Sequence, residues 1–224
     1  MLQQNIISSS SPKQRRLRVM IADDIQETRR STRLMLSMIP GVRVIAIAHN
    51  GREAVQLARK YRPDIAIMDV NMPQVDGLRA IRALQQTNPD MVCIVMSAER
   101  DSQVMSEAMA AGAQDFLIKP FTLEELEEAI QKAKEIIKEK QARQQKLEEQ
   151  RAQRELWLKQ KANQFIEERR TDNEALRVFE ALAADPQCEP RWLMYLAVIY
   201  VFRQQWRKLR ILAERLERQT RISA

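Results

Sequence analysis

Short apolar runs and longer amphipathic runs alternate along the first 137 residues of the chain. The apolar runs are rich in Val, Ile and Met and lack polar alternation, which is typical of strands buried on both faces of a parallel sheet. A fivefold alternation of strand and helix predicts an α/β fold, a doubly wound sheet of five parallel strands with helices on both faces. The predicted strands are residues 17–23, 42–48, 64–69, 91–97 and 113–119.

The segments between these strands have the three- and four-residue spacing of helices. In the first of them, this spacing predicts that Leu34, Met35 and Met38 face the sheet. All four glycines of the chain precede residue 130, where many short elements require many turns. We therefore expect one sheet domain over residues 17–137, preceded by a Ser-rich disordered tail over residues 1–16.

A long helix is predicted to leave this domain. It begins at a capping box, in which Thr122 is followed three residues later by Glu125, and its apolar stripe ends at Ile137. Residues 138–155 are helical in pattern but consist mostly of charged residues and glutamines. Because a coiled coil needs apolar positions sustained over several heptads, we interpret this segment as a solvated helical linker, with a weak coiled coil as the alternative.

Apolar positions return in residues 156–224, which predict an all-α domain of amphipathic helices. Aligning Ala175 with Leu209 gives a period of 34 residues, and this period resembles that of the tetratricopeptide motif. The region holds roughly one and a half such units, fewer than the three or so that a tetratricopeptide array needs for stability. A plain four-helix bundle is therefore the alternative.

The net charge of +7 is carried by the part of the chain after residue 130, because the preceding part has equal numbers of acidic and basic side chains. A basic region fits nucleic-acid binding or ordinary solvated helix faces. The single histidine, His49, excludes His-rich metal sites and catalysis by two imidazoles. Because we find neither an apolar signal segment nor a run of about 20 apolar residues, we expect a cytoplasmic protein without membrane contact.

Polar side chains stand at several predicted strand ends: Asp23 and Asp24, Asp69, Ser97 and Lys119. The carboxyl ends of parallel strands lie on one edge of the sheet, where ligands bind in open α/β folds. We therefore expect three carboxylates, a hydroxyl and an ammonium group to converge. Because close carboxylates repel one another and hard cations prefer oxygen ligands, the pattern predicts a Mg²⁺ site suited to phosphoryl transfer.

These residues and the motifs around them resemble the response-regulator receiver domain of the chemotaxis-regulator type. The matching pieces are Asp23-Asp24, the sequence DVNMPQVDG from Asp69 to Gly77, MSAE around Ser97 and DFLIKPF around Lys119. Each piece alone is weak, but together and in register they are specific, and they cover residues 17 to about 137. The resemblance implies a flavodoxin-like version of the doubly wound sheet and a role in two-component signalling.

The resemblance implies that Asp69 accepts a phosphoryl group from a phosphohistidine of a histidine kinase or phosphotransfer protein, forming an acyl phosphate. It further implies a Mg²⁺ ion held by Asp23, Asp24, Asp69 and the main-chain carbonyl of Asn71. A protein of this kind is a regulator and not an enzyme acting on other substrates. Its receiver catalyses only its own Mg²⁺-dependent phosphotransfer and dephosphorylation.

The resemblance assigns the switch to side chains on the last two predicted strands. Lys119 would pair with the phosphoryl oxygens and precede a cis peptide bond to Pro120. Ser97 would hydrogen-bond the phosphoryl group, and Phe116 would move into the space that this serine leaves. Many receivers have tyrosine at the position of Phe116, so a permanently buried core residue is the alternative interpretation.

No output motif of the family is matched strongly after the receiver, so two classes of output remain. The first is a helical protein-interaction module with a downstream protein partner, with a homodimer through the last receiver helices or the linker as a further option. The second is a DNA-binding transcriptional regulator that uses the basic terminal helix. The candidate effector surface consists of Trp206, Arg207, Lys208, Arg215 and Arg218. A leucine stripe on the same helix favours the first class, because it indicates a core-facing side.

Overall fold

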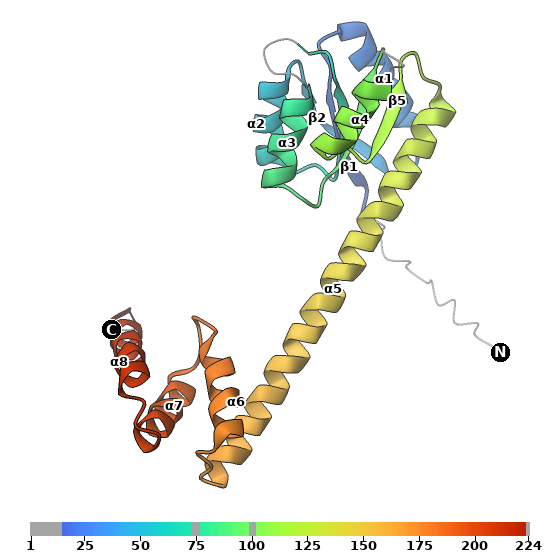
Figure 1. The fold of residues 1–224 in the computed structure, drawn as a ribbon. Coiled ribbons are helices and arrows are strands. Elements are labelled where there is room, and N and C mark those ends of the chain that lie inside the picture. Colours follow the sequence, from blue (N-terminus) through green and yellow to red (C-terminus); the bar gives the residue numbers. More distant parts are fainter. Residues whose placement is uncertain (1–14, 73–76, 99–101, 223–224) are drawn as a thin grey trace, which may run out of the picture. The chain divides into compact units, whose positions relative to one another are not determined.

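The structure is a computed structural model that describes residues 15–72, 77–98 and 102–222, without the side chains of residues 102 and 218–222. The chain forms two compact units, the first ending at Ala142 and the second beginning at Arg143. The long helix α5 (Leu123–Glu167) contributes residues to both units (Figure 1).

The first unit is a parallel sheet covered by helices on both faces. Its elements are β1 (Leu17–Ala22), α1 (Gln26–Met38), β2 (Val42–Ala48), α2 (Gly51–Tyr61), β3 (Ile65–Asp69), α3 (Gly77–Thr87), β4 (Val92–Ser97), α4 (Ser102–Ala111), β5 (Asp115–Ile118) and the first part of α5. The strand order is β2-β1-β3-β4-β5, and every neighbouring pair is parallel. The predicted flavodoxin-like, doubly wound fold is confirmed.

Two apolar cores fill the layers between the sheet and its helices. One core joins the sheet to α2, α3 and α4, and it includes Leu78, Ile81 and Leu84 of α3. The other core joins the opposite face of the sheet to α1 and α5. Because β3 and β4 have helices on both sides, all of their residues are buried, which explains their uninterrupted apolar sequences.

The buried face of α1 differs from the prediction. Leu34 and Met38 are 59% and 57% exposed, whereas Thr32, Leu36 and the adjacent Ile39 are buried. These three residues are also spaced by four and three positions, so the sequence contains two overlapping helical stripes. Met35 is half-buried against the core as predicted, but the prediction was wrong for Leu34 and Met38, because a threonine at a core position hides the buried stripe from a purely apolar pattern.

Side-chain caps fix the starts of two helices of the first unit. At α2, the Asn50 side chain accepts a hydrogen bond from the Glu53 N–H at 2.8 Å. At α5, the Glu125 N–H donates to Thr122 Oγ1 at 3.2 Å, and the Thr122 N–H donates to Glu125 Oε2 at 2.8 Å. These reciprocal bonds confirm the predicted capping box.

The described part of the second unit is helical. The end of α5 is followed by α6 (Asn173–Ala183), α7 (Pro190–Phe202) and α8 (Trp206–Ile222). Phe165, Phe179 and Trp192 are at most 1% exposed and form the centre of the shared core. The Phe179 ring lies 4.7 Å from the Tyr195 ring and 6.3 Å from the Trp192 ring, measured between centroids. A helical C-terminal part is therefore confirmed, while its tetratricopeptide-like character stays a prediction.

The middle of α5 is solvated. Every residue from 141 to 157 is exposed, including Leu147 and Trp157. This exposure agrees with a solvated helical segment, while the linker boundaries at residues 138 and 155 stay predictions. Within the described ranges, α5 included, no helix has the length and apolarity needed to cross a membrane.

Candidate functional site

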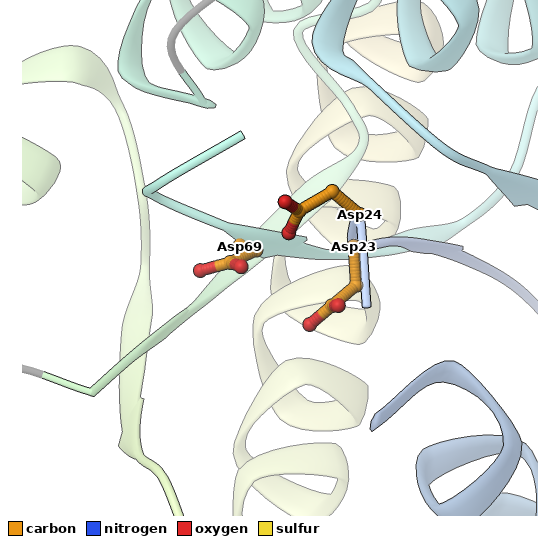
Figure 2. A group of neighbouring side chains, drawn as sticks. All are labelled: Asp23, Asp24 and Asp69. Atoms are coloured by element: carbon orange, nitrogen blue, oxygen red, sulfur yellow. The ribbon is translucent and has the colours of Figure 1, made fainter. Parts of the chain in front are cut away.

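Three carboxylates meet at the carboxyl-terminal edge of the sheet. Asp23 and Asp24 follow β1 directly, and Asp69 is the last residue of the neighbouring strand β3. One carboxylate oxygen of each residue lies within 4.8 Å of the other two, and Figure 2 shows the side chains gathered at these strand ends. Because β1 and β3 are adjacent and parallel, their ends share one edge, and the predicted convergence of the aspartates is observed.

Lys119 adds a positive charge to this cluster. Its Nζ lies 2.5 Å from Asp23 Oδ2 and 2.9 Å from Asp69 Oδ2. The Asp23 and Asp69 side chains are 0% and 6% exposed, whereas Asp24 is exposed. Three carboxylates beside one ammonium group leave an excess of negative charge when all are ionised. Such an excess in a largely buried site favours the binding of a further cation.

Asp23 is held by hydrogen bonds to both of its carboxylate oxygens. The Ile25 N–H donates to Oδ1 at 2.8 Å, and Lys119 donates to Oδ2. Burial raises the pKa of the Asp23 carboxyl, and the hydrogen bond from Lys119 opposes this shift. Arg29 Nη1 donates to the Asp23 main-chain carbonyl at 2.7 Å. The sequence pattern gave no sign of this arginine contact, because Arg29 lies on the first turn of α1 among other charged residues.

A glycine at the start of α3 allows the backbone to pass close to Asp69. A Cβ atom at Gly77 would lie 2.1 Å from the Asp69 carbonyl oxygen, far inside any real contact distance. The Gly77 N–H donates to the Val70 carbonyl at 3.1 Å, and the Val70 N–H donates to the Met96 carbonyl at 3.0 Å. Only glycine fits this approach. The Asp-Gly pair in the receiver-like motif was the available signal for it.

The other predicted switch and catalytic residues lie on β4 and β5 or beside them. Ser97 is the fully buried last residue of β4, and its carbonyl accepts a hydrogen bond from the Lys119 N–H at 2.7 Å. The Lys119–Pro120 peptide bond is cis, as the resemblance implies. Phe116 on β5 is half-buried against the core shared with α2, α3 and α4. Its role as a switch stays a prediction.

The backbone of Asn71 lies beside Asp69. The Asn71 N–H faces Asp69 Oδ1 at 3.3 Å, and the Asn71 side chain is exposed. The use of its main-chain carbonyl as a metal ligand stays a prediction. Residues 73–76 of the motif DVNMPQVDG and Glu99 of the motif MSAE lie outside the described residues.

The donor set fits Mg²⁺. This ion is usually bound by one or two carboxylates together with several waters. Asp23 and Asp69 supply buried carboxylates, and the exposed Asp24 leaves one side of the cluster open to water. A divalent cation at these oxygens would also offset the excess negative charge and supply positive charge to the oxygens of a phosphoryl group.

Two of the basic residues of the candidate effector surface are engaged within the second unit. Lys208 Nζ forms an ion pair with Glu180 Oε1 at 2.7 Å. The Arg215 guanidinium donates to the main-chain carbonyls of Ala183 and Asp185, at the carboxyl end of α6. These contacts attach α8 to α6, so both cations contribute to the packing of the helices.

Other residues of that surface face solvent. Trp206 is 60% exposed, and Arg207 is exposed beside it. The side chain of Arg218 lies outside the described residues. Exposed apolar side chains also extend along α7, a feature that the sequence analysis did not single out; they are Met194, Val198, Val201 and Phe202.

Comparison with known proteins gives a family match to the first unit. A family model described as the response regulator receiver domain matches residues 19–131. The chemotaxis protein CheY of Thermotoga maritima is 37% identical over 115 residues, which are 51% of this chain and 95% of that protein. The signal receiver domain of NarL from Mycobacterium tuberculosis superposes with a TM-score of 0.51 at 29% identity, covering 53% of this chain and 97% of that one.

Longer relatives are similar to about half of this chain, and their names describe different kinds of protein. The transcriptional regulatory protein DegU of Brevibacillus brevis is 36% identical over 115 residues, 51% of this chain and 49% of that protein. A protein-glutamate methylesterase/protein-glutamine glutaminase of Carboxydothermus hydrogenoformans is 37% identical over 130 residues, 55% of this chain and 37% of that protein. The chain thus spans half or less of the length of these relatives, and the family match ends within the first unit.

Proposed function

The chain belongs to the response regulator receiver family, and from this premise we propose that Asp69 accepts a phosphoryl group and that this event controls the helical second unit. The observation that carries the proposal is the convergence of Asp69, Asp23, Asp24 and Lys119 at one edge of the sheet. A histidine kinase or phosphotransfer protein of a two-component phosphorelay is the proposed donor.

In the proposed reaction, a carboxylate oxygen of Asp69 forms a bond to phosphorus while the bond from phosphorus to the donor histidine nitrogen breaks. Lys119, whose Nζ is 2.9 Å from Asp69 Oδ2, is close enough to pair with the transferred oxygens. Asp23, Asp24, Asp69 and the main-chain carbonyl of Asn71 are the proposed Mg²⁺ ligands. The ion would neutralise part of the charge of the phosphoryl group.

We assign the transmission of this event to β4 and β5. The phosphoryl group carries about −1.5 to −2 charges, in place of the single negative charge of the Asp69 carboxylate. Ser97, buried at the end of β4, is the proposed hydrogen-bond donor to the new group. Phe116 lies on the paired strand β5, opposite Val95, so a movement near Ser97 has a neighbouring aromatic ring that can respond. The result is a shift between two packings of the first unit.

For the second unit, the proposal is a protein-interaction module, with residues 138–155 as linker and residues 156–224 as effector. The support comes from α7, which packs Trp192 and Leu196 into the core and still exposes Met194 and Phe202 at 62% and 73%. Exposed apolar side chains that continue along one element are typical of surfaces that bind a partner protein. A tetratricopeptide-like pairing of the helices is the more specific form of this proposal.

A DNA-binding regulator is the second candidate, because Arg207 and Arg210 are exposed on α8. The test is the binding of the full chain to mixed-sequence duplex DNA at several salt concentrations. We expect no binding even at low salt. Binding that falls steeply with salt, and that the variant Arg207→Gln/Arg210→Gln loses, would replace the protein-interaction proposal with the DNA-binding one.

The receiver proposal is tested with acetyl phosphate as a small-molecule donor. We expect the intact mass of the full chain to show one added phosphoryl group, only when Mg²⁺ is present, and none in Asp69→Asn. Asp90→Asn is the matched control, because Asp90 is an exposed acid in the loop before β4. Undiminished modification of Asp69→Asn would refute the proposal.

A further inference from the structure

A groove between α2 and α3 of the first unit has cations on its rim and apolar side chains at its floor. The two helices lie side by side (Figure 1), and the groove between them has a volume of about 450 Å³. Its lining includes the arginines Arg52, Arg59 and Arg79 and the apolar residues Val55, Ala80 and Ala83, and no acidic residue. We call this feature the α2–α3 groove.

The three arginines of the α2–α3 groove are exposed and have no ion pair or hydrogen-bonded side-chain partner among the described residues. Arg52 and Arg59 are seven residues apart on α2, which separates them by two helical turns, about 10 Å along the axis. Arg79 lies on the opposite wall, at the first turn of α3. The guanidinium groups therefore border the groove from both sides and remain available for anionic groups of a ligand.

Acidic side chains near the α2–α3 groove do not neutralise its positive charge. The basic residues of α2, α3 and the turn after α2 are Arg52, Arg59, Lys60, Arg62, Arg79 and Arg82, and the acidic residues of these segments are Glu53 and Asp64. Asp64 is engaged away from the groove, because its Oδ2 accepts from the Arg18 N–H at 2.8 Å and its Oδ1 pairs with Arg15 Nη2 at 3.2 Å. Glu53 is engaged elsewhere, because its Oε2 accepts from the His49 N–H at 2.8 Å and lies 2.9 Å from His49 Nδ1. Since the first 130 residues are balanced in charge overall, this is a local concentration of positive charge.

The floor of the groove is apolar and is built from small side chains. Ala80 is fully buried, and Ala83 and Val55 are half-buried. Small residues at these positions leave a hollow between the helices. A ligand that touched only the arginines would leave the hollow unfilled, so its shape and polarity favour a ligand with apolar side chains next to its acidic groups.

We infer that the α2–α3 groove binds an acidic amphipathic helix of a partner protein. Apolar side chains of that helix would fill the floor at Ala80 and Ala83, as in other helix-in-groove complexes. Carboxylates two turns apart on it would pair with Arg52 and Arg59, whose planar guanidinium groups match carboxylate geometry. The inference is independent of phosphoryl transfer, because the groove uses no residue of the Asp69 site.

The first test uses the full chain and a fluorescein-labelled synthetic helix of Glu, Leu and Ala, with glutamates seven residues apart beside a leucine stripe. The matched control peptide has Gln in place of every Glu. We expect fluorescence anisotropy to show binding of the acidic peptide and binding at least about fivefold weaker for the control, the order for two or three exposed ion pairs. Equal binding of both peptides, or binding of neither, would overturn the inference.

Two triple variants distinguish binding of the acidic peptide in the groove from attraction of the peptide by net charge. Arg52→Gln/Arg59→Gln/Arg79→Gln should weaken binding of the acidic peptide by about tenfold. The control, Arg30→Gln/Arg33→Gln/Arg43→Gln, removes the same charge from exposed arginines elsewhere in the first unit and should leave the affinity within about twofold. An equal loss in both variants would show attraction by net charge alone and would overturn the inference.

A third variant tests the floor without changing any charge. Ala83→Leu fills the hollow, and we expect it to weaken binding of the acidic peptide while far-UV circular dichroism and modification by acetyl phosphate stay unchanged. If Ala83→Leu bound the acidic peptide as tightly as the unaltered chain does, the apolar floor would not be part of the binding site, and the inference of a helix that fills it would be overturned. Mixed-sequence duplex DNA is the competing probe: tighter, groove-dependent binding of DNA than of the peptide would identify a polyanion site instead of a helix-binding one.

Discussion

In the first unit, Asp23 and Asp69 lie buried beside a single ammonium group, whereas in the second unit Arg170 pairs with Asp172 and Glu174 at the surface. The second unit exposes a series of large apolar side chains along a single helix, α7. The two units therefore differ in what they leave unsatisfied: negative charge at the sheet edge of the first unit, and apolar surface along α7 of the second. Under the proposed function, the sheet edge would bind a cation and accept a phosphoryl group, and the exposed apolar side chains of α7 (Met194, Val198, Val201 and Phe202) would bind a partner protein.

The largest expected effect is the loss of stability of the second unit in Phe179→Ala, which tests whether the two units unfold separately. Phe179 is fully buried, and its ring contacts the rings of Tyr195 and Trp192. We expect the free energy of unfolding of the second unit to fall by about 3–5 kcal/mol. All three tryptophans of the chain lie after residue 143, so tryptophan fluorescence in a urea titration reports on this unit alone.

The control for that experiment is Phe202→Ala, because Phe202 is 73% exposed. We expect it to change the fluorescence transition by less than about 0.5 kcal/mol. Neither variant should alter modification of Asp69 by acetyl phosphate. If Phe179→Ala abolished this modification, the description of two separate units would be contradicted.

The next effect concerns Gly77→Ala at the Asp69 site. The added Cβ would meet the Asp69 carbonyl oxygen at 2.1 Å, so the backbone must shift, and we expect a cost of about 1–3 kcal/mol or more together with slower phosphorylation. Far-UV circular dichroism during urea unfolding and intact mass after acetyl phosphate treatment measure the two effects.

Gly41→Ala is the matched control for Gly77→Ala. Gly41 has a φ of +79°, and a Cβ there would meet no atom within 4 Å. We expect a backbone cost of about 1–2 kcal/mol and unchanged phosphorylation. A Gly77→Ala variant that is as stable and as readily phosphorylated as the unaltered chain would show that the close approach is unimportant.

A smaller effect is expected from Mg²⁺. An ion that binds only the folded first unit should raise its free energy of unfolding by about 2.7 kcal/mol at a concentration 100 times the dissociation constant. Asp24→Asn should reduce this rise without destabilising the Mg²⁺-free protein, because Asp24 is exposed. Urea unfolding followed by far-UV circular dichroism, with Glu128→Gln as an exposed-acid control, measures both quantities. An identical Mg²⁺ response in Asp24→Asn would remove Asp24 from the site.

The smallest effect lies in the second unit at alkaline pH. Burial raises the pKa of Tyr200 to about 12, and its hydrogen bond to Glu180 acts in the same direction. The unfolded chain, with a tyrosine pKa of about 10, loses this proton first. Stability should therefore fall as the pH rises from about 10 to about 12. Tyr200→Phe should reduce this slope in fluorescence-monitored urea unfolding at pH 9 and 11; an unchanged slope would contradict the assignment.

The fold of the first unit could be predicted because strands buried on both faces leave an unmistakable apolar sequence, as in β3 and β4. The convergence of Asp23, Asp69 and Lys119 followed from a simple rule, that parallel strands end at one edge. The buried stripe of α1 could not be predicted, because Leu34 and Leu36 are equally apolar and only packing against the sheet decides between them.

Contacts with other helices also determine which basic residues of α8 form ion pairs and which face solvent. In the sequence, Lys208 and Arg207 are equivalent neighbours, yet Lys208 pairs with Glu180 on another helix while Arg207 faces solvent. Similarly, α7 is apolar on every side, so its sequence could not tell which residues would remain exposed. Pattern analysis identifies charge and apolarity, but contacts between distant elements determine which of them stay available to a partner.

The most direct test of the central claim is to locate the modified residue. The full chain is treated with acetyl phosphate and Mg²⁺, and the acyl phosphate is reduced with borohydride, which converts a phosphorylated aspartate to homoserine. Peptide mass spectrometry should find homoserine at position 69, with Asp23 and Asp24 unchanged. Homoserine at another aspartate, with Asp69 intact, would contradict the account.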